Sequence, residues 1–468
     1  MTGEQDCLIL FYYIFYFKRY HLYFKEHNMV MIQNPYIVMK DGTIKQVNPF
    51  TGTEVWFIPG RGHKPDPNAR PKSARKIRVH TPEDYCNFCS SGYLNTPPEK
   101  ARLVRNTDGA YEMIKQVPAS ELNKTLPLFR RISNLFEIVS TDYWKKNYDY
   151  VLSDKNNKWK NHYLNDNNGV QHVLQVMHLK LRLSQMTEQQ IEKMPIEDKF
   201  TMADAFFGGC HELVIGGHHY RPGAEYDTDL WSSGEMTPEE HYHFFKFTIQ
   251  AAQDIYENNR YVRYISIFQN WLSPAGASFD HIHKQLVALD EWGISVQREV
   301  ELVRQNPNIY NEYASNFASY HNLVFAENEH ATAFISVGHR SPTLAVYSKS
   351  RACRPEEHSD EELRGFSDLV HACHVAMGGA IPCNEEWYYL PRDSVERLPW
   401  HILIKWRTNT PAGFEGGTKI YTNTLSPDQM RDIMVPQLYK YREQGKINAK
   451  YIATECPAKA NSLKYYMR

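Results

Sequence analysis

The sequence has almost no excess of either charge, no regular cysteine pattern and no apolar run long enough to span a bilayer. Its 468 residues include 53 Lys and Arg against 54 Asp and Glu, which gives a formal net charge of -1. This balance argues against nucleic acid or an anionic membrane surface as the main partner, because both attract strongly basic chains. Any recognition of phosphate must therefore come from a local site.

The 8 cysteines do not form a disulfide framework, because they are irregularly spaced in a long chain. Their usage favours a reducing, cytoplasmic setting. The apolar run at 7–17 has only about half the length of a membrane-spanning helix. Acidic residues before it, basic residues after it and the absence of a small-residue cleavage site also argue against a signal peptide. We treat residues 1–31 as an extension and expect no membrane partner.

Capping signals predict three helices. Residues 237–240 combine an N-cap threonine, a proline in the first turn and a capping-box glutamate, so we expect a helix that runs to about Asn259. Residues 359–362 predict a second helix, which ends at Met377 before two glycines. Residues 426–429 predict a third helix near the C-terminus.

The first two helices each lie between β-rich segments in the same order of strand, helix, strand, loop and strand. We therefore expect an α+β fold of duplicated units, in which helices pack on an antiparallel sheet. We place the first half at 32–300 and the second at 301–468. The polar, asparagine-rich segment 154–168 is expected to be a surface loop. The expected strands are 211–215, 264–268 and 281–289 in the first copy and 343–347, 386–390 and 400–406 in the second.

The last strand of the first copy follows a loop of small residues, in the stretch NWLSPAGASFDHIHKQ at 270–285. His281, His283 and Gln285 are two residues apart, so an extended strand presents them on one face. Small loop residues allow backbone N–H groups to approach an anion, and we expect that anion to be a phosphate. A neutral imidazole can attack phosphorus, which suits a covalent nucleotidyl-histidine. The alternative is that these histidines are ordinary core or surface residues.

The stretch also has an ordered spacing, with Asn270, Gly276, Ser278, His281, His283 and Gln285 in succession. This pattern resembles the galactose-1-phosphate uridylyltransferase family of the histidine-triad superfamily. The resemblance implies two histidine-triad-like halves, with His283 as the nucleophile on the α-phosphate and His281 as a metal ligand. The phosphate contacts that it implies are Ser278 and Gln285, together with Asn270, Gly276 and Ala277.

Three positions in and around this motif affect the interpretation. Hydrolases of the superfamily carry a third histidine where Gln285 stands, and an amide cannot shuttle a proton at neutral pH, so glutamine favours transfer over hydrolysis. Leu272 replaces a glycine that is usual in the family. In the second copy, His401 aligns with His281 but the second histidine is missing. We therefore expect catalysis in the first half and a substrate wall in the second.

A metal site is predicted from Cys86 and Cys89, whose spacing suits two thiolates on one Zn²⁺. A redox pair is the alternative, although the strand-then-helix setting of such motifs is missing. The family resemblance implies two further ligands, His281 and either His219 or its neighbour His218. A closed site of two cysteines and two histidines would be structural and would not activate water.

The resemblance also nominates residues that line the substrate. Lys64 stands where the family commonly has an arginine, which removes a bidentate phosphate contact. Glycine-rich sequence such as that around Phe414 is also found in turns that bind nothing. The nominated residues are Arg61 and Lys64 for phosphate, Asn134 for the nucleoside, and Phe414, Glu415 and Asn423 for the sugar phosphate.

The leading hypothesis is a cytoplasmic, homodimeric zinc protein that transfers a nucleoside monophosphate between a nucleotide sugar and a hexose 1-phosphate. The reaction would resemble that of a UDP-hexose:hexose-1-phosphate uridylyltransferase, with a double displacement at His283. A phosphorylase or hydrolase of nucleotide sugars or dinucleoside polyphosphates is the first alternative. A nucleotide-binding protein without turnover is the second.

Overall fold

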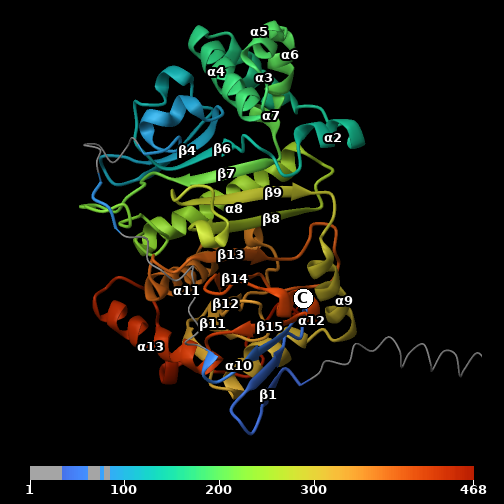
Figure 1. Cartoon of the computed structure of the whole chain (residues 1–468), viewed down its shortest axis with the longest axis vertical. Coiled ribbons are helices and arrows are strands. Elements are labelled where there is room, and N and C mark those ends of the chain that lie inside the picture. Colours follow the sequence, from blue (N-terminus) through green and yellow to red (C-terminus); the bar gives the residue numbers. More distant parts are fainter. Residues whose placement is uncertain (1–33, 62–73, 78–84, 468) are drawn as a thin grey trace, which may run out of the picture.

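The computed structural model describes residues 34–61, 74–77 and 85–467. These residues form a 12-stranded sheet, a separate 4-stranded sheet and helices packed on and around them. Figure 1 shows the strands of the large sheet stacked along the long axis of the molecule, in the order β16-β10-β11-β12-β14-β13-β8-β9-β7-β6-β4-β5. All neighbours in this order pair antiparallel, which confirms the expected α+β fold. The extension 1–31 and Lys64 lie outside the described residues.

The two copies meet in the middle of the large sheet. The first half contributes β4 (Glu99–Arg105), β5 (Tyr111–Lys115), β6 (Pro127–Ser133), β7 (His211–Gly216), β8 (Tyr264–Trp271) and β9 (His283–Leu289). The second contributes β10 (Val324–Glu327), β11 (Ala331–Ser336), β12 (Thr343–Ser348), β13 (Cys383–Tyr388), β14 (His401–Trp406) and β16 (Tyr451–Ile452). The halves join where β8 pairs with β13, and the strand order reverses across that pair. Two copies related by a twofold axis give this reversed order.

The small sheet pairs strands from opposite halves of the chain. It contains β1 (Tyr36–Val38), β2 (Ile44–Val47), β3 (Glu54–Phe57) and β15 (Ile420–Asn423). β3 pairs in parallel with β15, and Phe57 lies opposite Asn423. The N-terminal strands, which the sequence analysis counts with the first half, thus pair with a strand of the second. Arg61 follows the end of β3, so it leaves the sheet at the same end as Asn423.

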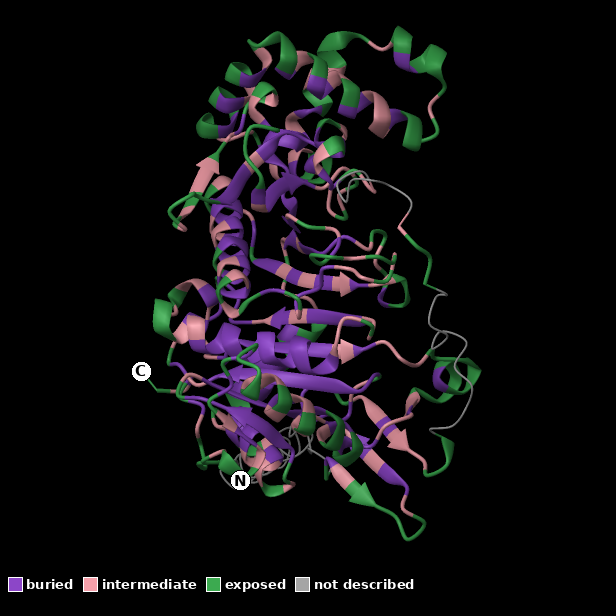
Figure 2. Ribbon diagram, turned by 90° about the vertical axis from the view of Figure 1, so that its left-hand side faces the viewer, coloured by how far each residue is buried: buried purple, intermediate pink, exposed green. Residues whose placement is uncertain are grey.

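The three helices predicted from capping signals are present. They are α8 (Pro238–Asn258), α11 (Asp360–Met377) and α13 (Pro427–Glu443), and each begins with a capping box. α11 ends at Gly378, which has a positive φ of 79°. α8 and α11 pack against each other and against the strands of their own halves. Figure 2 shows that the sheet and these helices form the buried interior.

A buried ion pair joins the halves beneath these helices. Lys284 of β9 and Glu385 of β13 are both fully buried and form a salt bridge. His374 of α11 shares a hydrogen bond with the same carboxylate at 2.8 Å, and the indole of Trp387 donates to it at 2.6 Å. Loss of one partner from a buried pair leaves an uncompensated charge and typically costs about 3–5 kcal/mol. This contact therefore opposes separation of the two halves.

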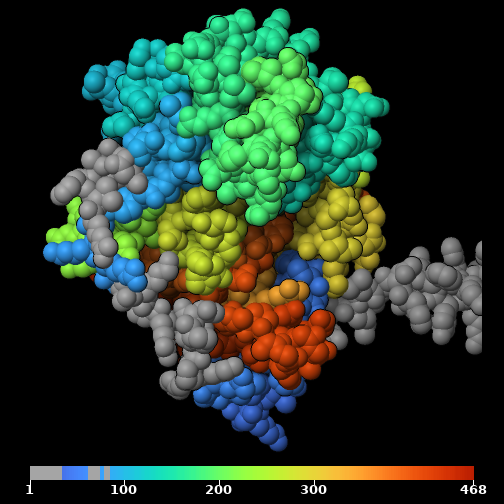
Figure 3. All heavy atoms as spheres, turned by 45° about the horizontal axis from the view of Figure 1, so that its top comes forward, coloured from blue at the N-terminus to red at the C-terminus, as the bar shows by residue number. Residues whose placement is uncertain are grey.

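A helical insertion lies at the end of the sheet that β4 and β5 form, and Figure 3 shows it covering that end. The predicted surface loop 154–168 was wrong, because helix α3 spans most of it. Ser153 caps α3, and Trp159 and Tyr163 pack against Phe207 with ring centroids 4.8 and 5.8 Å away. Burial of these aromatic rings stabilises a helix that polar composition alone does not predict. The insertion consists of α2 (Thr141–Tyr148), α3 (Asp154–Leu164), α4 (Asn167–Leu183), α5 (Glu188–Lys193), α6 (Ile196–Met202) and α7 (Asp204–Gly208).

Shorter elements connect the sheets. They are α9 (Ile294–Gln305), α10 (Asn316–Tyr320), α12 (Gly413–Thr418), η3 (Ser90–Asn95), η4 (Ala119–Glu121), η5 (Ser273–Ala275), η6 (Asn311–Ser315), η7 (Pro355–Glu357) and η8 (Ala453–Glu455). Within the described ranges, no helix combines the length and the apolar character needed to cross a membrane.

Candidate functional site

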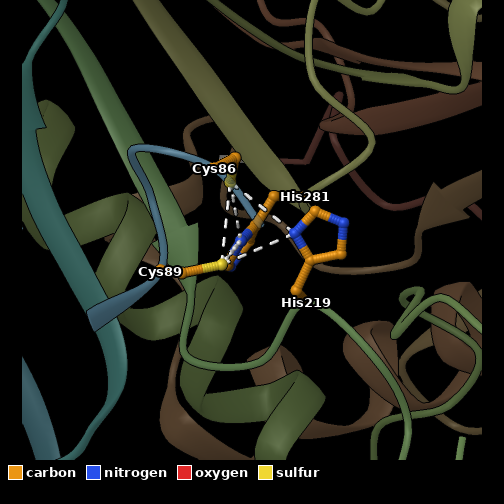
Figure 4. Close-up of side chains that lie close together, drawn as sticks. All are labelled: Cys86, Cys89, His219 and His281. Atoms are coloured by element: carbon orange, nitrogen blue, oxygen red, sulfur yellow. Dashed lines mark hydrogen bonds between the residues drawn. The ribbon is translucent and has the colours of Figure 1, made fainter. Parts of the chain in front are cut away.

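Four side chains from three separate segments meet in one cluster, which Figure 4 shows. They are Cys86, Cys89, His219 and His281, and one ligand atom from each lies within 4.8 Å of the others. The two sulfur atoms are 3.8 Å apart, and each Sγ to Nδ1 distance is 3.6 or 3.8 Å. A tetrahedral zinc ion with Zn–S of about 2.3 Å and Zn–N of about 2.0 Å places each sulfur roughly 3.5–3.8 Å from the other ligand atoms. The cluster therefore fits a metal ion of this kind.

Neighbouring groups orient the ligands. His281 Nε2 donates to the carbonyl of Gly216 at 2.7 Å, which leaves the Nδ1 lone pair facing the sulfurs. A hydrogen bond from the Cys86 thiol holds the pKa of Cys89 well below its usual range. A thiolate is the form that binds metal.

The structure also separates the two adjacent histidines. His219 lies in the cluster, whereas His218 makes an edge contact with Trp231 at a centroid distance of 5.1 Å. Of the two candidates left open by the sequence, His219 is the one placed to bind a metal ion.

His283 stands at the start of β9, two residues beyond the ligand His281. Its Nδ1 lies 2.8 Å from the His281 carbonyl oxygen, so Nδ1 carries the proton and donates it. The lone pair of Nε2 is then free, and no hydrogen bond from a described residue reaches it. Burial lowers the pKa of His283 to about 4, which keeps the ring neutral at physiological pH. Phe88, between the two cysteines, packs on this ring at a centroid distance of 5.5 Å. The segment that carries the two cysteines thus touches the candidate nucleophile.

The loop before β9 contains a strained residue. Leu272 has φ 66° and ψ 157°, a region of the backbone map that is almost exclusive to glycine. A side chain held there costs about 1–3 kcal/mol. The glycine that the family resemblance implies at this position would adopt this conformation without strain. Gly276, with φ 87°, meets the same requirement without strain.

The expected cradle of loop N–H groups is only partly present. The backbone N–H groups of Ala275 and Ala277 donate to the Leu272 carbonyl at 3.0 and 3.3 Å, and that of Gly276 donates to Ser273 at 2.9 Å. Gly276 and Ala277 thus donate their backbone N–H groups inside the loop, and their contact with a phosphate remains a prediction. The internal bonds form because the left-handed turn at Leu272 folds the loop onto its own carbonyls. Ser278 is exposed, and in the described part of the chain nothing hydrogen-bonds to its backbone N–H.

The second half holds this loop through a residue that sequence reasoning missed. Asn384 of β13 donates to Asn270 Oδ1 at 2.7 Å and to the Ala275 carbonyl at 2.8 Å. Arg407 in turn donates to Asn384 Oδ1 at 3.1 Å. The Asn270 amide nitrogen is thereby directed toward the loop, 4.0 Å from where a Cβ on Gly276 would lie. No sequence motif marks Asn384, because only the pairing of β8 with β13 brings it here.

Gln285 and Asn134 are brought together by another residue that the sequence analysis did not nominate. His211 Nε2 lies 3.1 Å from Gln285 Oε1 and 3.1 Å from Asn134 Nδ2. Asn134 also donates its backbone N–H to the His211 carbonyl at 2.8 Å. The predicted phosphate contact and the predicted nucleoside contact therefore lie side by side.

The other predicted substrate residues belong to the small sheet and α12. Arg61 is exposed, and Phe414 is 50% exposed. Glu415 is buried and accepts the backbone N–H of Ala412 at 2.9 Å and the Thr422 hydroxyl at 2.8 Å. Asn423 donates to the His339 carbonyl at 3.1 Å. These bonds attach α12 and β15 to the second half, and the contacts with a sugar phosphate remain predictions.

The pairing of the strands shows which residue of the second copy corresponds to His283. β14 pairs His401 with Tyr347, the last residue of the expected strand 343–347. β9 pairs His283 with Ile215, the last residue of the strand 211–215. His401 is therefore the structural counterpart of His283. Its sequence alignment with His281 was wrong by two residues, because amino-acid identity alone does not determine how the strands pair.

His401 nevertheless lies in a different environment from its counterpart. Its Nδ1 bonds to the carbonyl of Pro399, two residues earlier, at 3.0 Å. The rings of Tyr347 and Tyr388, from the two flanking strands, stack with it at 4.3 and 5.1 Å. Aromatic stacking makes His401 part of the core.

Two solved structures share this duplicated fold. A crystal structure of an ADP-glucose phosphorylase from Arabidopsis thaliana with bound ADP-glucose gives a TM-score of 0.52 at 16% identity, covering 84% of this chain and 98% of that chain. The X-ray structure of a GalT-like protein from Arabidopsis thaliana gives a TM-score of 0.50 at 16% identity, with the same coverage. The fold is thus that of galactose-1-phosphate uridylyltransferase-like proteins, as the histidine motif predicts.

The chain belongs to the family described as "Domain of unknown function (DUF4921)", which it matches over residues 39–465. Among curated proteins it also matches ADP-glucose phosphorylase from Arabidopsis thaliana, with 26% identity over 191 residues. That match covers 37% of this chain and 52% of the relative, so it spans about half of the relative's length.

Proposed function

We propose that the chain is a nucleotidyltransferase that acts on nucleotide sugars through a covalent nucleotidyl-His283 intermediate. The observation that carries the proposal is the state of His283, a buried neutral ring whose Nδ1 proton is held by the His281 carbonyl. That state leaves Nε2 free to act as the nucleophile, and we propose that the loop 272–278, which precedes His283 in the chain, receives the phosphate. The names of the relatives, which act on or bind nucleotide sugars, point in the same direction.

In the first half-reaction, His283 Nε2 attacks the α-phosphorus of the nucleotide sugar. A P–N bond forms, the bond from that phosphorus to the bridging oxygen breaks, and hexose 1-phosphate leaves with the electron pair. The His281 carbonyl stabilises the positive ring through the Nδ1 proton. Charge on the non-bridging oxygens would be stabilised by donors from Ser278, Gln285 and Asn270, with Arg61 and Lys64 as further candidates.

In the second half-reaction, a phosphate oxygen of the acceptor attacks the same phosphorus and the P–N bond breaks, which regenerates the neutral ring. With inorganic phosphate the product is a nucleoside diphosphate, and the enzyme is a phosphorylase. With a hexose 1-phosphate the product is a new nucleotide sugar. The curated relative is named a phosphorylase, so we place inorganic phosphate first among the acceptors and hexose 1-phosphate second.

We propose zinc as the ion of the cysteine and histidine cluster. Four protein ligands leave no open position for water, so the ion would supply folding energy and positioning. It would tie the segment that contains Phe88 to His281, and Phe88 would in turn support the ring of His283.

The test is intact-protein mass spectrometry after incubation with a panel of nucleotide sugars in the absence of phosphate. Wild type should gain the mass of one nucleoside monophosphate, and His283→Ala should gain nothing while keeping its metal content and unfolding midpoint. His218→Ala, which changes a histidine outside the cluster, is the matched control and should be labelled like wild type. Addition of inorganic phosphate or of hexose 1-phosphate then identifies the acceptor that removes the label. A metal-loaded wild type that no sugar nucleotide labels would refute the proposal.

A further inference from the structure

The structure assigns His211 a positioning role: it fixes the side-chain amide of Gln285 so that the NH₂ group, and not the oxygen, faces the phosphate. This inference rests on the proposed function and adds a residue to it. His211 itself does not contact the reacting atoms. Its effect on the reaction passes through Gln285.

The sheet places the two side chains next to each other. His211 opens β7, and Leu213 of that strand pairs with Gln285 of β9. Residues 211, 213 and 215 share one face of β7, so His211 is a diagonal neighbour of Gln285 on the face that also carries His283. The resulting distance from His211 Nε2 to Gln285 Oε1 is 3.1 Å.

A backbone donor fixes the tautomer of His211. The N–H of Ile138 donates to His211 Nδ1 at 3.1 Å. A ring nitrogen that accepts a hydrogen bond carries no proton, so the proton of the neutral ring is on Nε2. The ring is 1% exposed, and burial lowers its pKa to about 4. His211 therefore presents an N–H donor to Gln285.

This donor selects one of the two orientations of the Gln285 amide. The oxygen and nitrogen ends of a glutamine have nearly the same shape, and hydrogen bonding decides which end points where. Nε2–H of His211 requires an acceptor, so it holds Oε1 and turns the NH₂ group of Gln285 away from itself. The opposite orientation would set donor against donor at His211 and would direct oxygen lone pairs at an anionic phosphate.

Asn134 also lies close to His211 Nε2, but its orientation is set by a different hydrogen bond. Its Oδ1 accepts the backbone N–H of Phe136 at 2.9 Å, so its NH₂ group is the end that lies 3.1 Å from His211 Nε2. Two donors cannot bond to each other. The short distance between Asn134 and His211 is therefore not a hydrogen bond, and the Nε2 proton of His211 goes to Gln285 Oε1 alone.

The experiment compares variants that separate the two hydrogen bonds of His211. In His211→Asn, the shorter amide can still accept from Ile138 but cannot reach Gln285. In His211→Gln, the amide can place an N–H near the position of Nε2. His172→Asn is the matched control, because His172 is also buried but bonds to the structural groups Tyr163 and Thr96. Unfolding midpoints establish that each variant is folded.

The readout is the single-turnover rate of nucleotidyl-His283 formation, measured with the nucleotide sugar that labels wild type. We expect His211→Asn to slow the rate by about 10- to 100-fold, the usual effect of losing a supporting hydrogen bond to a functional side chain. His211→Gln should restore at least part of the rate, and His172→Asn should label at the wild-type rate. The double variant with Gln285→Ala should be no slower than Gln285→Ala alone, because His211 acts through that amide.

Two results would overturn the inference. One is labelling of His211→Asn at the wild-type rate. The other is a double variant whose loss is the product of the two single losses, which would mean that His211 acts independently of Gln285. If His211→Asn does not fold, His211→Leu, which offers no donor to Gln285, takes its place in the same comparison with Gln285→Ala. Failure of wild type to label refutes the proposed function instead, so the two failures are distinguishable.

Discussion

At position 272 we expect a glycine variant to be more stable than an alanine variant, which is the reverse of the usual order. Its φ of 66° and ψ of 157° cost about 1–3 kcal/mol for any residue with a Cβ. Leu272→Ala and Leu272→Gly lose almost the same buried surface, but only glycine removes the strain. Glycine also costs about 0.4–1 kcal/mol in the freedom of the unfolded chain. The difference predicts that Leu272→Gly is more stable than Leu272→Ala by roughly 0.5–2 kcal/mol.

Equilibrium urea unfolding measures this difference, provided that the two variants have the same dependence of unfolding free energy on denaturant. Val395 supplies the control pair, because it is 88% exposed and its φ is not positive. There we expect alanine to be at least as stable as glycine. If Leu272→Ala proves as stable as Leu272→Gly or more so, then Leu272 is not strained in solution, and the account of this loop is wrong.

Three further predictions concern the metal, the loop and a buried acid. Cys89→Ser should abolish the binding of one zinc ion per chain, measured by atomic absorption, whereas His218→Ala should retain the ion. A Cys89→Ser protein that still binds zinc would contradict the assigned cluster. Asn384→Ala removes one hydrogen bond to Asn270 and one to the loop carbonyl of Ala275, so it should slow nucleotidyl-enzyme formation about 10-fold. An unchanged rate would show that the second half does not position the loop. Burial raises the pKa of Glu299 from 4.5 to about 7, so the folded state should lose about 3 kcal/mol as pH rises from about 4.5 through about 7. Urea unfolding at pH 5 and pH 8 should show that Glu299→Gln lacks the loss of stability seen in wild type. An equal pH dependence of the unfolding free energy in wild type and Glu299→Gln would contradict the raised pKa of Glu299.

The parts of the fold that the sequence predicted depend on short-range physics. A helix cap needs only a side chain and the next three N–H groups, so residues 237–240 and 359–362 specify their helices without help from the rest of the chain. Strand periodicity is equally local, and it places His283 and Gln285 on one face of β9, whereas His281 precedes the strand. The helix α3 was missed because its buried face depends on Phe207, which is distant in sequence.

The residues of the candidate site that could not be predicted from the sequence share a property. His211 and Asn384 carry no motif of their own, and each acts by a hydrogen bond to a predicted residue on a neighbouring strand. Their partners are set by the register of β7 on β9 and of β13 on β8. A register is a property of paired strands, so a single segment cannot reveal it.

By itself the sequence determined which reactive groups the protein has and how neighbouring ones are spaced: two cysteines three residues apart and two histidines two residues apart. Only the tertiary structure decided that His219, and not His218, meets those cysteines. It also decided which nitrogen of each ring carries the proton, through the Gly216 carbonyl for His281 and the Ile138 N–H for His211. The physical reason is that covalent bonds fix the spacing of residues along the chain. The position of a ring proton depends instead on which donor or acceptor the folded chain places within about 3 Å of each nitrogen.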